Sequence, residues 1–228
     1  MASTHRHQPG LSNRLGVHGL IVAFIVVVAL ADVGLRNFGG SVSVRAFAMA
    51  TLPLVMSGQY WRIVTASLMQ PASDPIALAF SAYIMWWLLR TLSRYWPAAR
   101  VVAFVLLTGS VGVAFGLLCN FLNVPFTDIG PFMGLMPVME ALGVAFSFLE
   151  PEATLLLAFV FPVKGQVFRW VGLGFIAMET LFRGTVPTAS LAAWGLAFVW
   201  MSNYTKKPKS HLRAVPPGPY RGGNSWLN

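Results

Sequence analysis

The sequence predicts an all-α polytopic membrane protein that crosses a bilayer six times. Of its 228 residues, 56% are hydrophobic and only 10% are charged. The mean hydropathy is +0.66, which is too apolar for an ordinary soluble domain. The apolar residues also gather into stretches close to the length of about 20 residues that a helix needs to cross a hydrocarbon core of about 30 Å. We therefore expect most of the chain to lie in a membrane.

Apolar stretches separated by more polar connections mark the predicted crossings. They are Val17–Leu35, Pro75–Leu92, Arg100–Leu122, Phe132–Leu149, Phe168–Phe182 and Pro187–Tyr204. A further apolar run, Ala153–Phe161, ends at Pro162. It is too short to cross as a helix, so we expect it to lie in the membrane interface or against the bundle.

Three regions follow from this reading. Residues 1–16 form a basic N-terminal segment, residues 17–204 form the membrane domain, and residues 205–228 form a basic tail rich in proline and glycine. Alone in water such a tail is extended or disordered. We expect its basic side chains to contact anionic lipid headgroups or a partner: Lys206, Lys207, Lys209 and Arg213.

The basic residues also predict the orientation of the chain. With six crossings, most of them fall on one side: Arg6, Arg14, Arg90, Arg94, Arg100, Lys164, Arg169 and those of the tail. Because lysine and arginine are retained on the inner side of a membrane, both termini are predicted to be cytoplasmic or on the matrix side. The expected location is a bacterial inner membrane or the inner membrane of an organelle. This bias accounts for the net charge of +9, so no nucleic-acid partner is predicted.

The long connection between the first two crossings, residues 36–74, has a mixed character. It holds prolines, glycine and aromatic residues among scattered apolar ones. A soluble loop would be more polar, so we expect a structured, half-buried element in the outer leaflet, with Tyr60 and Trp61 at headgroup depth.

Three motifs then occur in an order that resembles the rhomboid superfamily. The first is Gly58–Met69, which contains Trp61-Arg62. The second, Gly134–Phe146, is similar to the fourth rhomboid helix, and the third, Phe161–Trp170, includes Pro162 and is similar to the entry into the fifth. The resemblance covers roughly residues 56–203. It implies a six-helix rhomboid-like transmembrane bundle with a half-buried first loop.

The departures from the family's motifs decide the activity that the resemblance implies. Met136 stands where active rhomboids have the nucleophilic serine, and the histidine position falls on Ser190 or Ala189. All histidines lie near the chain ends: His5, His7, His18 and His211. A thioether cannot attack a carbonyl, and nothing in the sixth helix accepts a proton near neutral pH. The resemblance therefore implies a pseudoprotease with no catalytic residue.

Glu140 is the most unusual residue of the predicted membrane domain. It lies inside the fourth crossing, where a carboxylate is costly enough to indicate a function by default. It is open to pairing with an arginine, to staying protonated or to contacting a client helix. We favour a structural role, with hydrogen bonds inside the bundle or to a partner subunit.

Other polar and small residues receive structural interpretations. Glu179 and Arg183 are four residues apart and are expected to form an intrahelical pair. Gly112 and Gly116 are expected to serve helix packing within the bundle. Asp128 is a lone acid without nearby ligands, so neither a metal nor a cofactor is predicted.

Three functions remain open from the sequence. The first is a catalytically inactive rhomboid-like scaffold or adaptor that binds transmembrane helices of partner or client proteins, beside lipids. The second is a structural accessory subunit of a larger membrane complex. The third is an atypical intramembrane protease or a transporter, although a transporter would show more intramembrane polar residues than Glu140.

Overall fold

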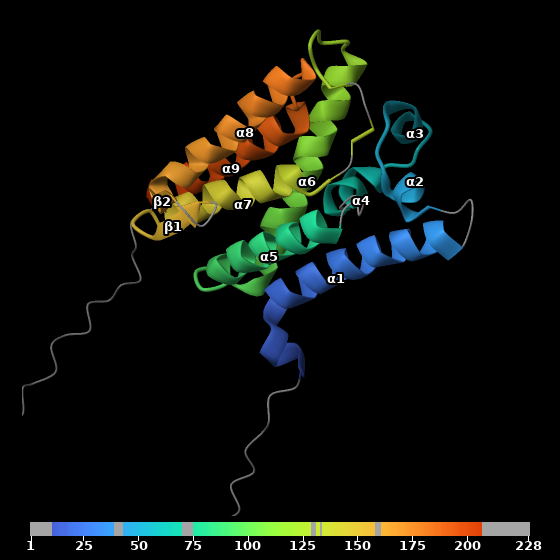
Figure 1. Cartoon of the computed structure of the whole chain (residues 1–228). Helices are drawn as coiled ribbons and strands as arrows, with labels where there is room; N and C mark the ends of the chain where they lie inside the picture. Colours follow the sequence, from blue (N-terminus) through green and yellow to red (C-terminus); the bar gives the residue numbers. More distant parts are fainter. Residues whose placement is uncertain are drawn as a thin grey trace, which may run out of the picture.

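The computed structural model describes residues 11–38, 43–69, 75–128, 131–132, 134–157 and 161–206. These residues form a bundle of helices of very different lengths, with a small β-hairpin at one end (Figure 1). The helices and strands are, in chain order, α1 (Leu11–Phe38), α2 (Val44–Ala48), α3 (Leu52–Met56), α4 (Arg62–Leu68), α5 (Pro75–Leu92), α6 (Ala98–Phe121), α7 (Met136–Leu149), β1 (Thr154–Leu157), β2 (Phe161–Lys164), α8 (Phe168–Arg183) and α9 (Thr188–Lys206).

The six predicted crossings coincide with the six longer helices of this part of the chain. The predicted second stretch, Pro75–Leu92, has the same bounds as α5. By length and hydropathy, α1 and α6 are long and apolar enough to cross a membrane, whereas the apolar parts of α5 and α7 are shorter. The helical membrane-protein class is thus supported, and α1 and α6 have the length and hydropathy of a membrane crossing.

Helix α7 occupies the centre of the bundle. It packs against α5, α6, α8 and α9, and Figure 1 shows it between α5 and α8. Residues 141–147 of α7 are all buried, which matches the run of small and apolar side chains there. Around them lies the main core, whose largest fully buried side chains include Phe104, Phe146, Met85, Leu88, Leu89 and Leu142.

Glycines on α6 allow the close approach of its neighbours. A Cβ at Gly112 would lie 2.6 Å from the Ala189 carbonyl oxygen on α9, and one at Gly116 would lie 2.4 Å from the Phe132 ring. Both distances are shorter than any van der Waals contact. The expectation that this Gly-x-x-x-Gly serves internal packing is therefore confirmed, and the contacts lie within one chain.

The described part of the first connection is folded, as expected. It forms the short helices α2, α3 and α4, with Ala48, Val55, Arg62 and Ala66 buried and Tyr60 and Trp61 exposed. Helix α4 packs on α6 and α2. An isolated bridge between Ala50 and Phe132 joins this element to the segment before α7.

The structure differs from the sequence prediction in some details. The run that begins at Ala153, predicted not to cross as a helix, is part of a β-hairpin: β1 and β2 pair antiparallel, with Leu156 opposite Pro162, so the fold is not purely α-helical. Helix α7 begins at Met136 rather than at Phe132, which is engaged in the bridge to Ala50. Trp96 is buried against Phe104 and Tyr204.

Candidate functional site

The arginine of the Trp61-Arg62 motif links two short helices of the first connection by hydrogen bonds. Arg62 is only 7% exposed, and its guanidinium donates to Gln59 Oε1 at 2.6 Å and to the carbonyls of Ala46 and Met49 at 2.8 and 3.0 Å. These carbonyls lie at the end of α2, where backbone acceptors lack helical partners. A cation placed there also complements the helix dipole. Arg62 therefore ties α4 to the C-terminus of α2.

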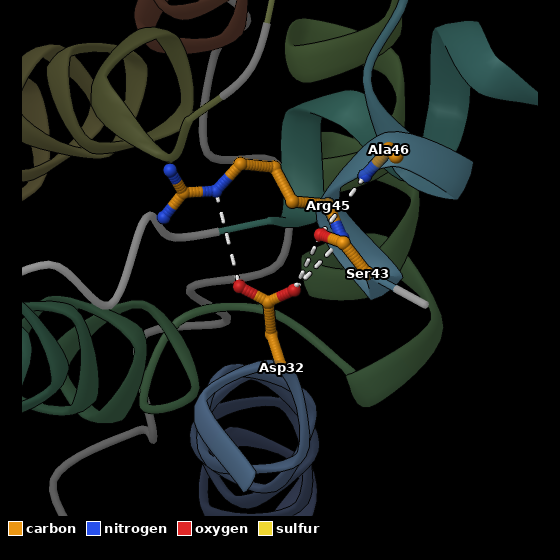
Figure 2. A network of polar contacts seen from close by, with 4 residues as sticks. All are labelled: Asp32, Ser43, Arg45 and Ala46. Atoms are coloured by element: carbon orange, nitrogen blue, oxygen red, sulfur yellow. Dashed lines mark hydrogen bonds and ion pairs between the residues drawn. The ribbon is translucent and has the colours of Figure 1, made fainter. Parts of the chain in front are cut away.

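An acidic residue that the sequence analysis did not single out anchors the other end of α2. Asp32 is fully buried on α1, and its Oδ1 accepts from the Ser43 hydroxyl at 3.1 Å and from the Arg45 backbone N–H at 3.0 Å. Figure 2 shows its second oxygen facing the Arg45 guanidinium, with Arg45 Nε at 3.8 Å. Ser43 in turn caps α2 at the Ala46 N–H. Asp32 thus binds α1 to the first connection.

A cavity of about 260 Å³ lies at the end of the bundle where α7 and α9 begin and α8 ends. Its lining comes from four helices and two connections. The chemistry-bearing lining residues are Asp128, Met136, Glu179, Arg183, Thr188 and Ser190. Glu179 and Arg183 form the expected intrahelical ion pair at 3.1 Å.

The cavity brings together the two positions that the rhomboid motifs predicted for catalysis. Met136 opens α7 and Ser190 lies in the first turn of α9, and both line the same space. Neither side chain supplies a base, and His18, the histidine that lies within the described ranges, is not among the lining residues.

Two buried polar side chains beside this cavity have no hydrogen-bond partner among the described residues. Glu140 is 8% exposed and neither carboxyl oxygen is bonded. Its near neighbour is the Ser190 hydroxyl, yet the pair does not meet hydrogen-bond geometry. Thr188, which lines the cavity, is 4% exposed and its Oγ1 is also unpartnered. The favoured hydrogen bond of Glu140 within the bundle is therefore not found in the described part of the chain.

The remaining predicted residues are dispersed. Gly134 lines the cavity with φ of 130°, a conformation that favours glycine. Pro162 lies in strand β2, in the hairpin next to the other end of α7. Lys206 ends α9, and Lys207, Lys209 and Arg213 lie outside the described residues. Within the described ranges, no three His, Cys, Asp or Glu side chains gather as metal ligands would.

The comparison with protein families identifies the class of this chain. Residues 15–225 match the family described as eukaryotic integral membrane protein (DUF1751). The chain belongs to this family, which is rhomboid-like. The resemblance that the motifs indicated is thus confirmed at the level of the family. No match was found among curated proteins.

Proposed function

We propose that this protein is a catalytically inactive rhomboid-like adaptor that binds transmembrane helices of partner or client proteins. The observation that carries the proposal is the common cavity of Met136 and Ser190, which stand at the positions of the rhomboid nucleophile and base. A thioether and a hydroxyl make neither an activated nucleophile nor a general base. The scaffold is retained while its protease groups are replaced.

The proposal includes six crossings with both termini on the cytoplasmic or matrix side. The six longer helices supply the crossings, and lysine and arginine gather on one side of them. In this arrangement α2, α3, α4 and the cavity lie at the outer end of the bundle. A bound helix would then meet the cavity in the outer leaflet.

Helix α8 offers the face on which a partner helix would dock. It packs against α7 and, less extensively, against α9. Large apolar side chains on it remain exposed: Trp170, Phe175, Met178, Leu181 and Phe182. Because Glu179 and Arg183 of the same helix line the cavity, a partner on this face would lie directly beside it.

Site-specific photo-crosslinking tests the docking face. A photoreactive side chain at Met178 on α8 is compared with one at Phe115 on α6, since these residues are almost equally exposed, at 46% and 43%. The proposal expects protein crosslinks to membrane-spanning segments from position 178 and lipid adducts alone from position 115. Equal protein crosslinking from both positions would contradict it.

The inactive state is tested separately with a fluorophosphonate probe, which labels activated serines. We expect no labelling of the purified protein in detergent or in nanodiscs. Labelling of the wild type that is lost in Ser190→Ala would show a reactive serine in the cavity and would contradict the pseudoprotease proposal.

A structural accessory subunit of a larger complex is the second candidate. It is favoured by the Glu140 carboxyl, which has no hydrogen-bond partner in the part of the chain that the structure describes and which a permanent partner would satisfy equally well. Stoichiometry separates the two candidates, because a subunit co-purifies with fixed partners at integer ratio and an adaptor does not.

A further inference from the structure

Two buried polar groups beside the cavity, the Glu140 carboxyl and the Thr188 hydroxyl, have no hydrogen-bond partner among the described residues. Burying a polar group without a hydrogen bond costs about 1–3 kcal/mol, and more for a charged one. Glu140 and Thr188 both carry this cost among the described residues. An unsatisfied buried group calls for a physical explanation, and a group supplied from outside the chain is one.

The position of Glu140 connects it to the cavity. It follows Met136 by one helical turn, so the two side chains lie on the same face of α7. Met136 and Pro137 line the cavity, as does Ser190, the near neighbour of the Glu140 carboxyl. Glu140 therefore lies just behind the cavity wall, and Thr188 forms part of that wall.

The charges around the cavity favour a cation. Arg183, the basic lining residue among those described, is already paired with Glu179. Glu140 adds a further carboxyl without a basic partner in the described part of the chain. An ammonium or guanidinium group carries several N–H donors and no acceptor. Such a cation would supply donors to the Glu140 carboxyl and to the Thr188 hydroxyl oxygen, which have no partner among the described residues.

The dimensions favour a single side chain. The volume of about 260 Å³ is below the range of about 300–1,000 Å³ that is usual for pockets of drug-sized ligands. The neighbouring surface is the exposed apolar face of α8, whose Leu181 and Phe182 lie close to the lining residues Glu179 and Arg183. A helix lying on that face would extend one side chain into the cavity.

We propose that this cavity selects partner transmembrane segments that carry a lysine or arginine, whose cation pairs with Glu140 and donates to Thr188. The inference rests on the proposed helix-binding function and names the partner class. Intramembrane charges pair with one another across helices, so each segment would relieve the burial cost of the other. Glu140 is the fifth residue of α7, and four residues rise about 6 Å along a helix. The partner's basic residue would therefore lie about 6 Å inside the outer end of α7.

The test uses designed single-span polyleucine segments and the full chain in phosphatidylcholine nanodiscs, whose headgroups carry no N–H donor. Segments with one lysine at successive depths are compared with the all-leucine segment by quantitative capture. The protein variants are Glu140→Gln, Glu140→Asp and, as a matched control acid far from the cavity, Glu152→Gln in the exposed turn between α7 and β1. Each variant is first shown to elute and melt as the unchanged protein does.

The expected result is a lysine segment captured about tenfold better than the leucine segment, with a maximum at the depth of Glu140. Glu140→Gln should abolish that preference, while Glu140→Asp and Glu152→Gln keep it. Equal capture of both segments, or a lysine preference that survives in Glu140→Gln, would overturn the inference and leave the adaptor function standing. Capture of neither segment would overturn both. Loss of the preference on addition of phosphatidylethanolamine, with no depth dependence, would assign the cavity to a lipid ammonium and also overturn it.

Discussion

Arg62 in the first connection and Glu140 in α7 are nearly equally buried, at 7% and 8% exposure, but their surroundings differ completely. The arginine makes three hydrogen bonds to the described residues, and the glutamate makes none. A buried charge with all its partners serves the fold. A buried charge without partners costs stability.

The side chains at the two ends of α2 and those at the cavity differ in the same way, in whether they have hydrogen-bond partners. At α2, Arg62 satisfies the C-terminal carbonyls and Asp32 satisfies a hydroxyl and an N–H group near the N-terminus. The lining of the cavity includes the ion pair of Glu179 with Arg183 and the Thr188 side chain. Among the described residues, Thr188 Oγ1 and the carboxyl of Glu140, which lies behind the lining, have no hydrogen-bond partner.

The largest effect is expected for Arg62→Met, which keeps an extended apolar stem and removes the guanidinium. Three acceptors then lose donors, and a hydrogen bond to a charged group contributes about 1.5–3 kcal/mol. We expect the free energy of unfolding to fall by about 3 kcal/mol or more. The measurement is denaturant unfolding in detergent micelles. Arg62→Lys should recover only part of the loss, because a lysine cannot match the fork of the guanidinium. An Arg62→Met variant that unfolds at the same denaturant midpoint as the wild type would show that the hydrogen bonds of Arg62 do not stabilise the fold.

A smaller effect of opposite sign is expected for Glu140→Leu. The substitution replaces an unpartnered buried carboxyl with an apolar group of similar size, which is often neutral or stabilising. We expect the free energy of unfolding to rise by about 1 kcal/mol in the absence of any partner. Thr188→Val, which removes only the unpartnered hydroxyl, should act in the same direction. A clear loss of stability in both variants would show that these groups support the fold.

The smallest effect concerns the hydrogen bond between Tyr95 and Glu150, in the connections at the other end of the bundle. The Tyr95 hydroxyl donates to Glu150 Oε1 at 2.5 Å, and this bond, with partial burial, raises the pKa of Tyr95 above its ordinary value of 10.0. A raised tyrosine pKa means that the stabilisation is complete below pH 10 and is lost as the pH rises through the folded-state pKa. At neutral pH we expect Tyr95→Phe to lower the free energy of unfolding by less than about 0.5 kcal/mol.

The measurement for this pair is unfolding of the wild type and of Tyr95→Phe at neutral and at strongly alkaline pH. The difference between the two proteins should vanish at the alkaline end. A difference that grows with pH would show that the ionised tyrosine is the stabilised form.

The helices of the bundle were the most predictable part of the molecule. Long apolar stretches bounded by prolines and charges, such as Pro75–Leu92, specify helices by hydropathy alone. The start of α7 was displaced because Phe132 pairs with Ala50, a contact that depends on the folded first connection. The hairpin of β1 and β2 was missed because a short apolar run does not distinguish a strand from an interfacial segment by periodicity.

The sequence singled out some of the residues that line the cavity but not others, and it did not show which of them have hydrogen-bond partners. Motif order placed Met136 and Ser190 at corresponding positions, and the cavity does bring them together. Thr188 and Asp32 were not singled out, because a lone threonine or aspartate acquires meaning only through its tertiary neighbours. That Glu140 lacks a partner in the described structure is likewise a property of three packed helices and cannot be read from one of them.

The central claim is that the protein is an adaptor for membrane helices whose cavity is completed by them. The most direct measurement is gentle-detergent purification of tagged wild type and Glu140→Gln from native membranes, with the co-purifying membrane proteins identified and counted. The account predicts a broad, substoichiometric set enriched in segments with membrane-embedded lysine or arginine, and loss of that enrichment in Glu140→Gln. A fixed set of partners at integer ratio, unchanged by the substitution, would contradict it.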